Sequence, residues 1–160
     1  MLIRNTSILS LEDLSIRRNV DISIRGPAIA RIGQGLQDDG EVLNGEGFHV
    51  IPGLCNTHAH TAMTLFRGVA EDVKIEDWFN KYIWRLERNL TPEDVYVGTL
   101  LGAGEMLLSG TTFVADNYFH MDQAARAYRD AGMRADLGQC FFGFGDNWKD
   151  QYQAALRFSE

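Results

Sequence analysis

Alternation between apolar and polar residues marks the first part of the chain. Over residues 20–24 every second residue is apolar, which is the pattern of a strand with one buried face. Gly26 and Pro27 form a turn signal, and the apolar run 28–33 is expected to return as the partner strand. Further β-like runs occur at residues 2–5, 7–10, 42–44 and 48–52. The pattern predicts a β-rich unit over residues 1–47.

After residue 47 the pattern changes to strands that alternate with helices. Thr91 is a suitable N-cap, Pro92 suits the first helical position, and the acids that follow favour the positive end of the helix dipole. Ser109 and Gly110 provide the stop signal. Strands are then expected at 111–116 and 134–142, and helices at 123–130, ended by Gly132, and at 151–160. This alternation predicts parallel βαβ units over residues 48–160.

The first strand of this second part is expected to begin at residue 51 and to end in a His-x-His motif formed by His58 and His60. Side chains alternate along a strand, so both imidazoles should project from the same face, with Cα atoms roughly 6.5 Å apart. Two imidazoles at this spacing can bind one metal ion, with Zn–N bonds of about 2.0–2.1 Å. The motif alone fits ordinary strand-end histidines better, so its surroundings must decide between the two interpretations.

Composition and charge restrict the classes of function. Hydrophobic residues make up 45% of the chain, charged residues 23%, and the formal net charge is −7. An acidic chain without Lys/Arg clusters argues against binding to nucleic acid or anionic membranes, and no apolar run is long enough to span a bilayer. Cys55 and Cys140 lie far apart in apolar stretches, which indicates buried free thiols in a reducing cytosol. We therefore expect a cytoplasmic protein.

Six motifs extend this interpretation. They are IPGLCNTHAH at 51–60, TAMTLFRGVAED at 61–72, DW at 77–78, GTT at 110–112, DNYFH at 116–120 and AGMRA at 131–135. Together they resemble the amidohydrolase superfamily, and more narrowly its branch of S-adenosylhomocysteine/5′-methylthioadenosine deaminases and triazine chlorohydrolases. The resemblance is weak over residues 1–47 and strong over residues 48–145.

The resemblance implies an α/β fold, namely an incomplete (β/α)₈ TIM-type barrel preceded by part of a small β-sandwich. A closed barrel needs about 250 residues, whereas this chain has 160 and ends on a helix-like run without a stop signal. We expect an N-terminal portion whose partners are the remaining part of the enzyme and further copies in a homo-oligomer. Two more histidines, an aspartate and the catalytic glutamate are expected downstream of Glu160.

The implied activity is hydrolytic deamination of an amino-purine nucleoside or a related amino-heterocycle. His58 and His60 would bind one divalent ion, with zinc favoured and Fe²⁺ or Mn²⁺ as alternatives. Residues 61–89 are expected to form a long loop, and such loops are commonly functional. In this loop Trp78 would border the small-molecule substrate and Glu87 would accept hydrogen bonds from the ribose hydroxyls. For Glu87, a surface acid paired with a neighbouring arginine is the alternative.

One position departs from the homocysteine-handling relatives, which place an arginine where this chain has Gln139. Glutamine cannot supply a cationic fork for a carboxylate, so S-adenosylhomocysteine itself is in doubt. Asp116 could orient a metal-bound histidine or serve as a structural cap, and His120 could face the site. Two alternatives to the deaminase stay open: a triazine-type hydrolase, and a non-catalytic fragment that needs its missing half.

Overall fold

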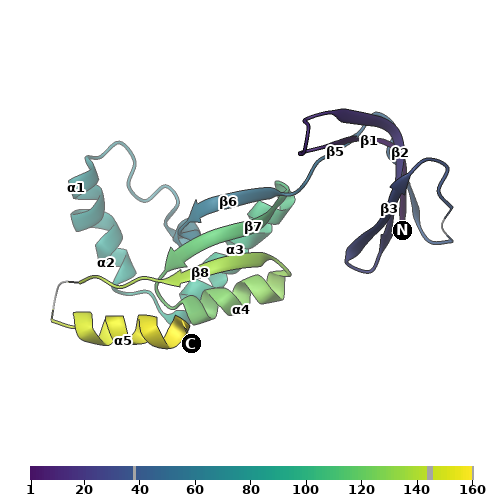
Figure 1. Cartoon of the computed structure of the whole chain (residues 1–160). Coiled ribbons are helices and arrows are strands. Elements are labelled where there is room, and N and C mark those ends of the chain that lie inside the picture. The colour runs from purple at the N-terminus through teal and green to yellow at the C-terminus, as the bar shows by residue number, and fades with distance from the viewer. Residues whose placement is uncertain (38, 144–145, 160) are drawn as a thin grey trace. The chain divides into compact units, whose positions relative to one another are not determined.

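A computed structural model describes residues 1–37, 39–143 and 146–159 (Figure 1). The chain divides into two compact units, Met1–Pro52 and Gly53–Glu160, which we describe separately. Over the described residues, no helix combines the length and apolar character that crossing a bilayer requires.

The first unit is a five-stranded sheet. Its strands are β1 (Leu2–Leu9), β2 (Ile16–Arg25), β3 (Ala28–Gly33), β4 (Val42–Asn44) and β5 (His49–Val50). The sheet has the order β3-β2-β1-β4, and β5 also pairs with β1. β1, β2 and β3 are successively antiparallel, as the Gly26 turn predicts, whereas β4 and β5 run parallel to β1.

The two apolar runs at 2–5 and 7–10 form one strand rather than two. A register irregularity lies between Ile3 and Thr6, and Asn5 has a left-handed backbone with a φ of 58°. The Asn5 amide donates to Asp21 Oδ1 at 2.9 Å, and the Leu36 amide donates to Asp21 Oδ2 at 3.0 Å. The Asn5 hydrogen bond is the largest cause that lowers the pKa of Asp21. A bulge held by one carboxylate therefore replaces the predicted break.

The second unit combines a parallel sheet with helices. Its strands are β6 (Leu54–Ala59), β7 (Thr111–Tyr118) and β8 (Arg134–Gln139), and its helices are η1 (Thr61–Phe66), α1 (Ile75–Asp77), η2 (Trp78–Ile83), α2 (Trp84–Glu87), α3 (Pro92–Leu108), α4 (Met121–Ala131) and α5 (Trp148–Ser159). The sheet order is β6-β7-β8 with both pairs parallel. The carboxyl ends of the three strands point toward the α1–α2 segment (Figure 1). The predicted mixed α/β architecture with βαβ units is confirmed.

The ends of α3 and α4 follow from local sequence. The Thr91 hydroxyl accepts from the Asp94 amide, and the Asp94 carboxylate accepts from the Thr91 amide, so the two residues form a capping box. Gly110 follows α3 with a φ of 84°, and Gly132 ends α4 with a φ of 70°. Both glycines therefore supply the left-handed backbone that their positions predicted.

The segment 61–89 differs from the expected loop. It contains the 3₁₀-helix η1 and then helical residues without a break from Ile75 to Glu87, including one π-helical turn, η2. Residues 72–90 contain neither glycine nor proline, so nothing in this stretch interrupts a helix. Asp77 and Lys81 add an i,i+4 ion pair at 2.9 Å. The connection is therefore a folded helical segment.

The core of the second unit lies between the sheet and helices η1, α3 and α4. Its buried members include Ala62, Val95, Ala103, Val114, Met121, Ala124 and Tyr128. Two glycines of α3 allow η1 to approach closely. A Cβ on Gly98 would lie 2.6 Å from the Ala62 carbonyl oxygen, and one on Gly102 would lie 2.5 Å from Thr61 Cγ2. The helix backbone itself therefore forms the surface against which η1 packs.

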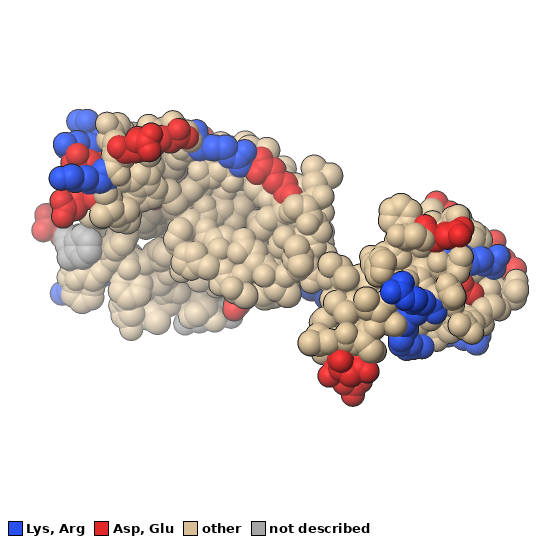
Figure 2. Space-filling model, turned by 90° about the horizontal axis from the view of Figure 1, so that it is seen from above, with Lys and Arg blue, Asp and Glu red and all other residues tan. Residues whose placement is uncertain are grey.

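One face of this unit has few charged side chains and includes exposed apolar residues. In Figure 2, Lys, Arg, Asp and Glu side chains follow one another along a rim and leave a broad uncharged area. Leu54, Leu101 and Leu108 are among the exposed large apolar residues, and Leu108 is 91% exposed. Cys55, on the edge strand β6, is exposed, so the predicted burial of both thiols is wrong for this one. Large exposed apolar areas are typical of contact surfaces.

Candidate functional site

His58 and His60 lie side by side where β6 ends. Their ring centroids are 5.0 Å apart, with the ring planes nearly perpendicular. Both side chains are exposed. His60 stands just after the strand and precedes η1. Two neighbouring imidazoles, accessible from solvent, are the arrangement that a shared metal ion requires.

A hydrogen bond fixes the tautomer of His60. Its Nδ1 lies 2.7 Å from the carbonyl oxygen of Asn117 on β7. A carbonyl oxygen can only accept, so Nδ1 carries the proton and the neutral ring keeps its lone pair on Nε2. Metal-binding histidines commonly donate their second ring N–H to a carbonyl in this way. The bond therefore orients His60 as a ligand through Nε2.

Asp116 holds the backbone that follows His60. Its Oδ1 accepts from the Thr61 amide at 3.1 Å, and its Oδ2 accepts from the Tyr128 hydroxyl at 2.6 Å. The same hydroxyl lies 2.6 Å from Thr61 Oγ1. Asp116 is only 3% exposed. Of the two roles that the sequence left open, these contacts favour the structural cap, which fixes where the chain leaves the histidine motif.

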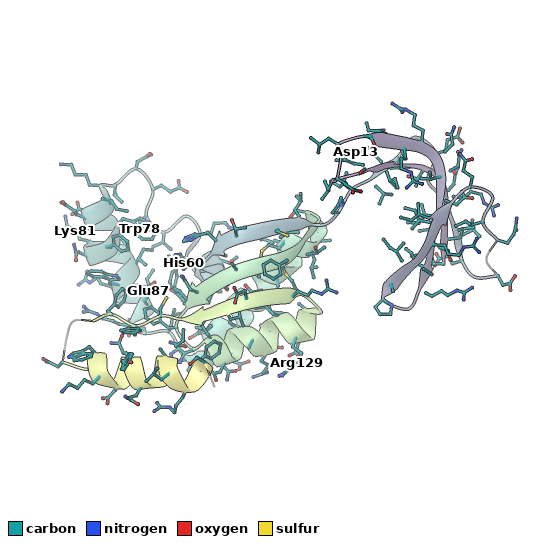
Figure 3. All side chains as sticks on the ribbon, in the orientation of Figure 1. Asp13, His60, Trp78, Lys81, Glu87 and Arg129 are labelled. Carbon is teal, nitrogen blue, oxygen red and sulfur yellow. The ribbon has the colours of Figure 1, made fainter. Side chains whose placement is uncertain are left out.

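Glu87 is engaged by a buried tyrosine. The Tyr118 hydroxyl donates to Glu87 Oε1 at 2.7 Å. Burial raises the pKa of Glu87, while the Tyr118 hydrogen bond and the charge of His60 oppose that shift. Among the described residues, no ion pair of Glu87 with Arg85 or Arg88 is found, so the surface-acid alternative is not what the structure shows. Figure 3 shows Glu87 and His60 at the same end of the strands.

A cavity of about 970 Å³ opens beside Glu87. Its lining includes Trp84, Phe119, His120, Gln139, Cys140 and Phe142. Phe142 joins the aromatic part of the wall, with its ring centroid 6.5 Å from that of Trp84 and 5.9 Å from that of Phe119. A half-buried carboxylate on an aromatic-lined cavity suits an organic ligand that carries hydroxyl groups.

The two other predicted substrate contacts have different surroundings. Gln139 lines the cavity, but its Oε1 accepts from the Met121 amide at 3.0 Å and its Nε2 donates to the Cys140 carbonyl at 3.1 Å. Its amide therefore caps the start of α4. The ring of Trp78 packs edge-on against Phe79, with centroids 4.9 Å apart, and is not among the residues that line this cavity.

Sequence reasoning missed Trp84 and Tyr118. Trp84 lines the cavity three residues before Glu87, a spacing that places two side chains on the same face of a helix. Recognising the helix over this segment would have pointed to Trp84. Tyr118 comes from β7 and meets Glu87 across 31 positions in sequence, so no local signal marks this pair.

The residues present fit part of a zinc site. Nitrogen ligands suit zinc, and His60 is oriented by its carbonyl hydrogen bond. Within the described part of the chain, no group of three or more His, Cys, Asp or Glu side chains is placed to hold a metal. A hollow of about 230 Å³ beside His58 also carries Asp116 and Asp136. The two histidines can therefore contribute to a metal centre that needs further ligands.

Comparison with known proteins gives one family match. The model of the amidohydrolase family matches residues 49–157. The chain is 40% identical to 5′-deoxyadenosine deaminase of Methanosarcina acetivorans, covering 94% of this chain and 35% of that protein. It is 43% identical to 5-methylthioadenosine/S-adenosylhomocysteine deaminase of Carboxydothermus hydrogenoformans, covering 87% and 33%. The chain thus spans about a third of the length of these relatives.

Solved structures agree on the fold. An adenosine deaminase from Xanthomonas campestris with bound zinc matches with a TM-score of 0.78 and 32% identity, covering 96% of this chain and 37% of that one. An atrazine chlorohydrolase from Arthrobacter aurescens complexed with zinc matches with a TM-score of 0.82, covering 98% and 42%. Its identity is 23%, so this second likeness concerns the fold alone.

Proposed function

Because the chain belongs to the amidohydrolase family, we propose that it is the N-terminal part of a metal-dependent hydrolytic deaminase. The proposed substrate is an amino-purine nucleoside or a related amino-heterocycle. Support comes from relatives about 40% identical that are named as deaminases of adenosine derivatives. Since the chain spans about a third of their length, the activity is assigned to the complete enzyme that this chain would begin.

In this proposal β6, β7 and β8 are the first three strands of a (β/α)₈ barrel, and the N-terminal sheet is part of a small β-sandwich. The parallel order β6-β7-β8 and its helical crossovers support this assignment. The exposed apolar residues on and around the edge strand would then contact the rest of the enzyme or another copy. A cytoplasmic location is part of the same proposal.

We assign His58 and His60 as two ligands of a divalent ion, with zinc favoured over Fe²⁺ or Mn²⁺. When bound, such an ion lowers the pKa of a water molecule so that hydroxide is available near neutral pH. The chain's own residues then have separate roles. The Asn117 carbonyl keeps the proton on Nδ1 of His60, and Asp116 fixes the backbone that leaves the motif. The acid–base groups are expected beyond Glu160.

The observation that carries the proposal is that Glu87 lines the large cavity and accepts from Tyr118, whose ring centroid lies 6.2 Å from that of His60. An ionised carboxylate can accept hydrogen bonds from both hydroxyls of a ribose. With the ribose at Glu87, the amino-bearing ring would extend toward the histidines and the 5′ substituent into the aromatic-lined cavity. Gln139 would contribute polarity to that wall, and Trp78 would border the ring.

The test uses the complete enzyme loaded with zinc. Ammonia release is measured with adenosine, 5′-deoxyadenosine and adenine, and chloride release with a chlorotriazine. Turnover of the nucleosides supports the proposal, whereas chloride release alone would favour the triazine alternative.

The same assays on residues 1–160, alone and mixed with the remaining part, examine the fragment alternative. We expect activity only when both parts are present, because a catalytic zinc usually takes three protein ligands. Metal-dependent turnover by residues 1–160 alone would contradict the assignment of essential groups to the missing part.

A further inference from the structure

Tyr118 connects the candidate metal ligand with the candidate substrate contact. It is the last residue of β7, and its side chain is only 4% exposed. Its hydroxyl donates to Glu87 Oε1 at 2.7 Å, and its ring centroid lies 6.2 Å from that of His60. One side chain thus touches residues from α2 and from the end of β6, two elements that carry the proposed site.

The position of this tyrosine is fixed by its surroundings. Its ring belongs to the buried core of the second unit and lies 5.1 Å, centroid to centroid, from the ring of Phe119. Its backbone carbonyl accepts from the Cys140 amide at 2.8 Å, and it pairs with Gln139 in the β7–β8 register. Burial and the Glu87 hydrogen bond raise the pKa of the phenol, so the hydroxyl stays protonated as a donor.

Glu87 has no comparable support of its own. It is the last residue of α2 and of the helical run that begins at Ile75, and its side chain is half-buried. A glutamate side chain loses considerable rotamer freedom when it is held in one geometry. The tyrosine hydroxyl donates to Oε1, and no donor to Oε2 is found over the described residues, which leaves Oε2 for a ligand in the adjoining cavity. The buried Tyr118 hydroxyl therefore restrains the more flexible Glu87 side chain at the edge of the cavity.

We infer that Tyr118 is a positioning residue for nucleoside recognition, because its hydroxyl holds Glu87 in the geometry that accepts the ribose diol. The inference rests on the proposed function and names the interaction that would make the enzyme selective for nucleosides with a ribose diol. Without the hydroxyl, the carboxylate would have to be ordered by the substrate, and that cost would appear in KM rather than in kcat.

The experiment compares adenosine with 2′,3′-dideoxyadenosine, which keeps the sugar ring but lacks the diol. In the complete zinc enzyme, Tyr118→Phe should raise KM for adenosine about tenfold. It should leave kcat, and the KM of the dideoxy compound, nearly unchanged. Combined with Glu87→Ala, it should add no further loss, because Tyr118 then has no carboxylate to hold. Tyr96→Phe is the matched control, since this half-buried tyrosine donates to Asp130 at 3.0 Å between α3 and α4.

Equal rises in KM for both nucleosides, or additive losses in the double variant, would overturn the inference. If Tyr118→Phe does not fold, Glu87→Asp tests the same pair from the helix, since its shorter carboxylate keeps the charge but withdraws from the tyrosine. A KM for adenosine as high as in Glu87→Gln supports the inference, and a KM near that of the unmodified enzyme overturns it.

A lack of turnover in the unmodified enzyme would contradict the proposed function instead. In that case calorimetric binding of adenosine and 2′,3′-dideoxyadenosine to the metal-free enzyme still tests Tyr118. Selective loss of adenosine binding in Tyr118→Phe supports the inference, and equal affinities of the two compounds for the unmodified enzyme overturn it.

Discussion

Tyr118–Glu87 and Tyr128–Asp116 are tyrosine–carboxylate pairs of the second unit that have different surroundings. The hydroxyl-to-carboxylate distances are similar, 2.7 Å for Tyr118–Glu87 and 2.6 Å for Tyr128–Asp116, and both phenols are nearly buried. Asp116 is buried as well, and each of its oxygens accepts a hydrogen bond, one of them from the Thr61 amide. Glu87 is half-buried beside a cavity, and among the described residues no donor forms a hydrogen bond with its Oε2.

The difference separates a structural carboxylate from one that is free to bind. A buried acid whose oxygens are both satisfied contributes to stability and has nothing to offer a ligand. A partly buried acid with one oxygen in use is held in place and still has acceptor capacity. The environment of the second oxygen therefore distinguishes the two pairs better than the tyrosine contact that they share.

The largest expected effect concerns the histidines that adjoin the Glu87 pair. His58→Ala or His60→Ala in the complete enzyme should reduce metal affinity by more than about 100-fold and abolish turnover, because each removes a proposed ligand. Elemental analysis of the purified variants measures the metal directly. His49→Ala, an exposed residue of the N-terminal sheet, is the control. Full metal occupancy in both histidine variants would show that His58 and His60 are not metal ligands.

The second-largest expected effect is a loss of stability when the Tyr128–Asp116 pair is broken. Asp116→Ala should lower the free energy of unfolding by about 3 kcal/mol, because it leaves the Thr61 amide and the Tyr128 hydroxyl without their buried acceptor. Urea unfolding of this variant and of Glu87→Ala measures the contrast, and we expect the second variant to change stability far less. A similar loss of unfolding free energy in Asp116→Ala and Glu87→Ala would show that both carboxylates have the same structural role.

Glu87→Gln should act on binding with little change in stability. Loss of a charged acceptor opposite the ribose hydroxyls should cost roughly 1.5–3 kcal/mol of binding free energy and raise KM for the ribonucleoside accordingly. KM for the free base should hardly change, since adenine has no diol. Steady-state kinetics with both compounds measures the difference. An equal effect on nucleoside and base would show that Glu87 does not contact the ribose.

The smallest effect is a dependence on pH. Burial raises the pKa of Glu87 above its ordinary value of 4.5. The ionised form is the better acceptor, so KM for the nucleoside should rise as the pH falls, and the rise should begin at a higher pH than for an exposed glutamate. Profiles of KM against pH test this, and Glu87→Gln should flatten the curve. A curve that keeps its shape in the variant would assign the titration to another group.

Local signals in the sequence predicted the features that depend on neighbouring residues. The N-cap at Thr91 and the helix-ending glycine at Gly132 need only a few residues to form, and both are confirmed. The strand before His58 was recognised from its apolar run, although β6 begins at Leu54 rather than at the expected residue 51. Such features are fixed by capping, backbone preference and strand alternation, which single sequences report well.

Features that depend on contacts between distant segments could not be predicted in this way. The strand expected over 134–142 ends at Gln139, whose side chain turns back to the start of α4. The pairing of Tyr118 with Glu87 joins residues of a strand and of a helix that was expected to be loop. Cys55 lies on an edge strand whose side chains are mostly exposed. Each outcome depends on contacts with a segment that is distant in sequence, and the local sequence pattern does not reveal such contacts.

The close packing of η1 on α3 has a consequence for engineering this protein. Exchanging glycine for alanine inside a helix ordinarily gains up to about 1 kcal/mol, which makes helix glycines early choices for thermostabilisation. At Gly98 and Gly102 the added methyl group would overlap the turn that directly follows the histidine motif. Gly104 of the same helix has open space, since a Cβ there meets nothing within 4 Å. In α3, Gly104 is therefore a suitable position for a stabilising alanine. Gly98 and Gly102 must stay glycine so that η1, which follows the histidine motif, can pack against the helix.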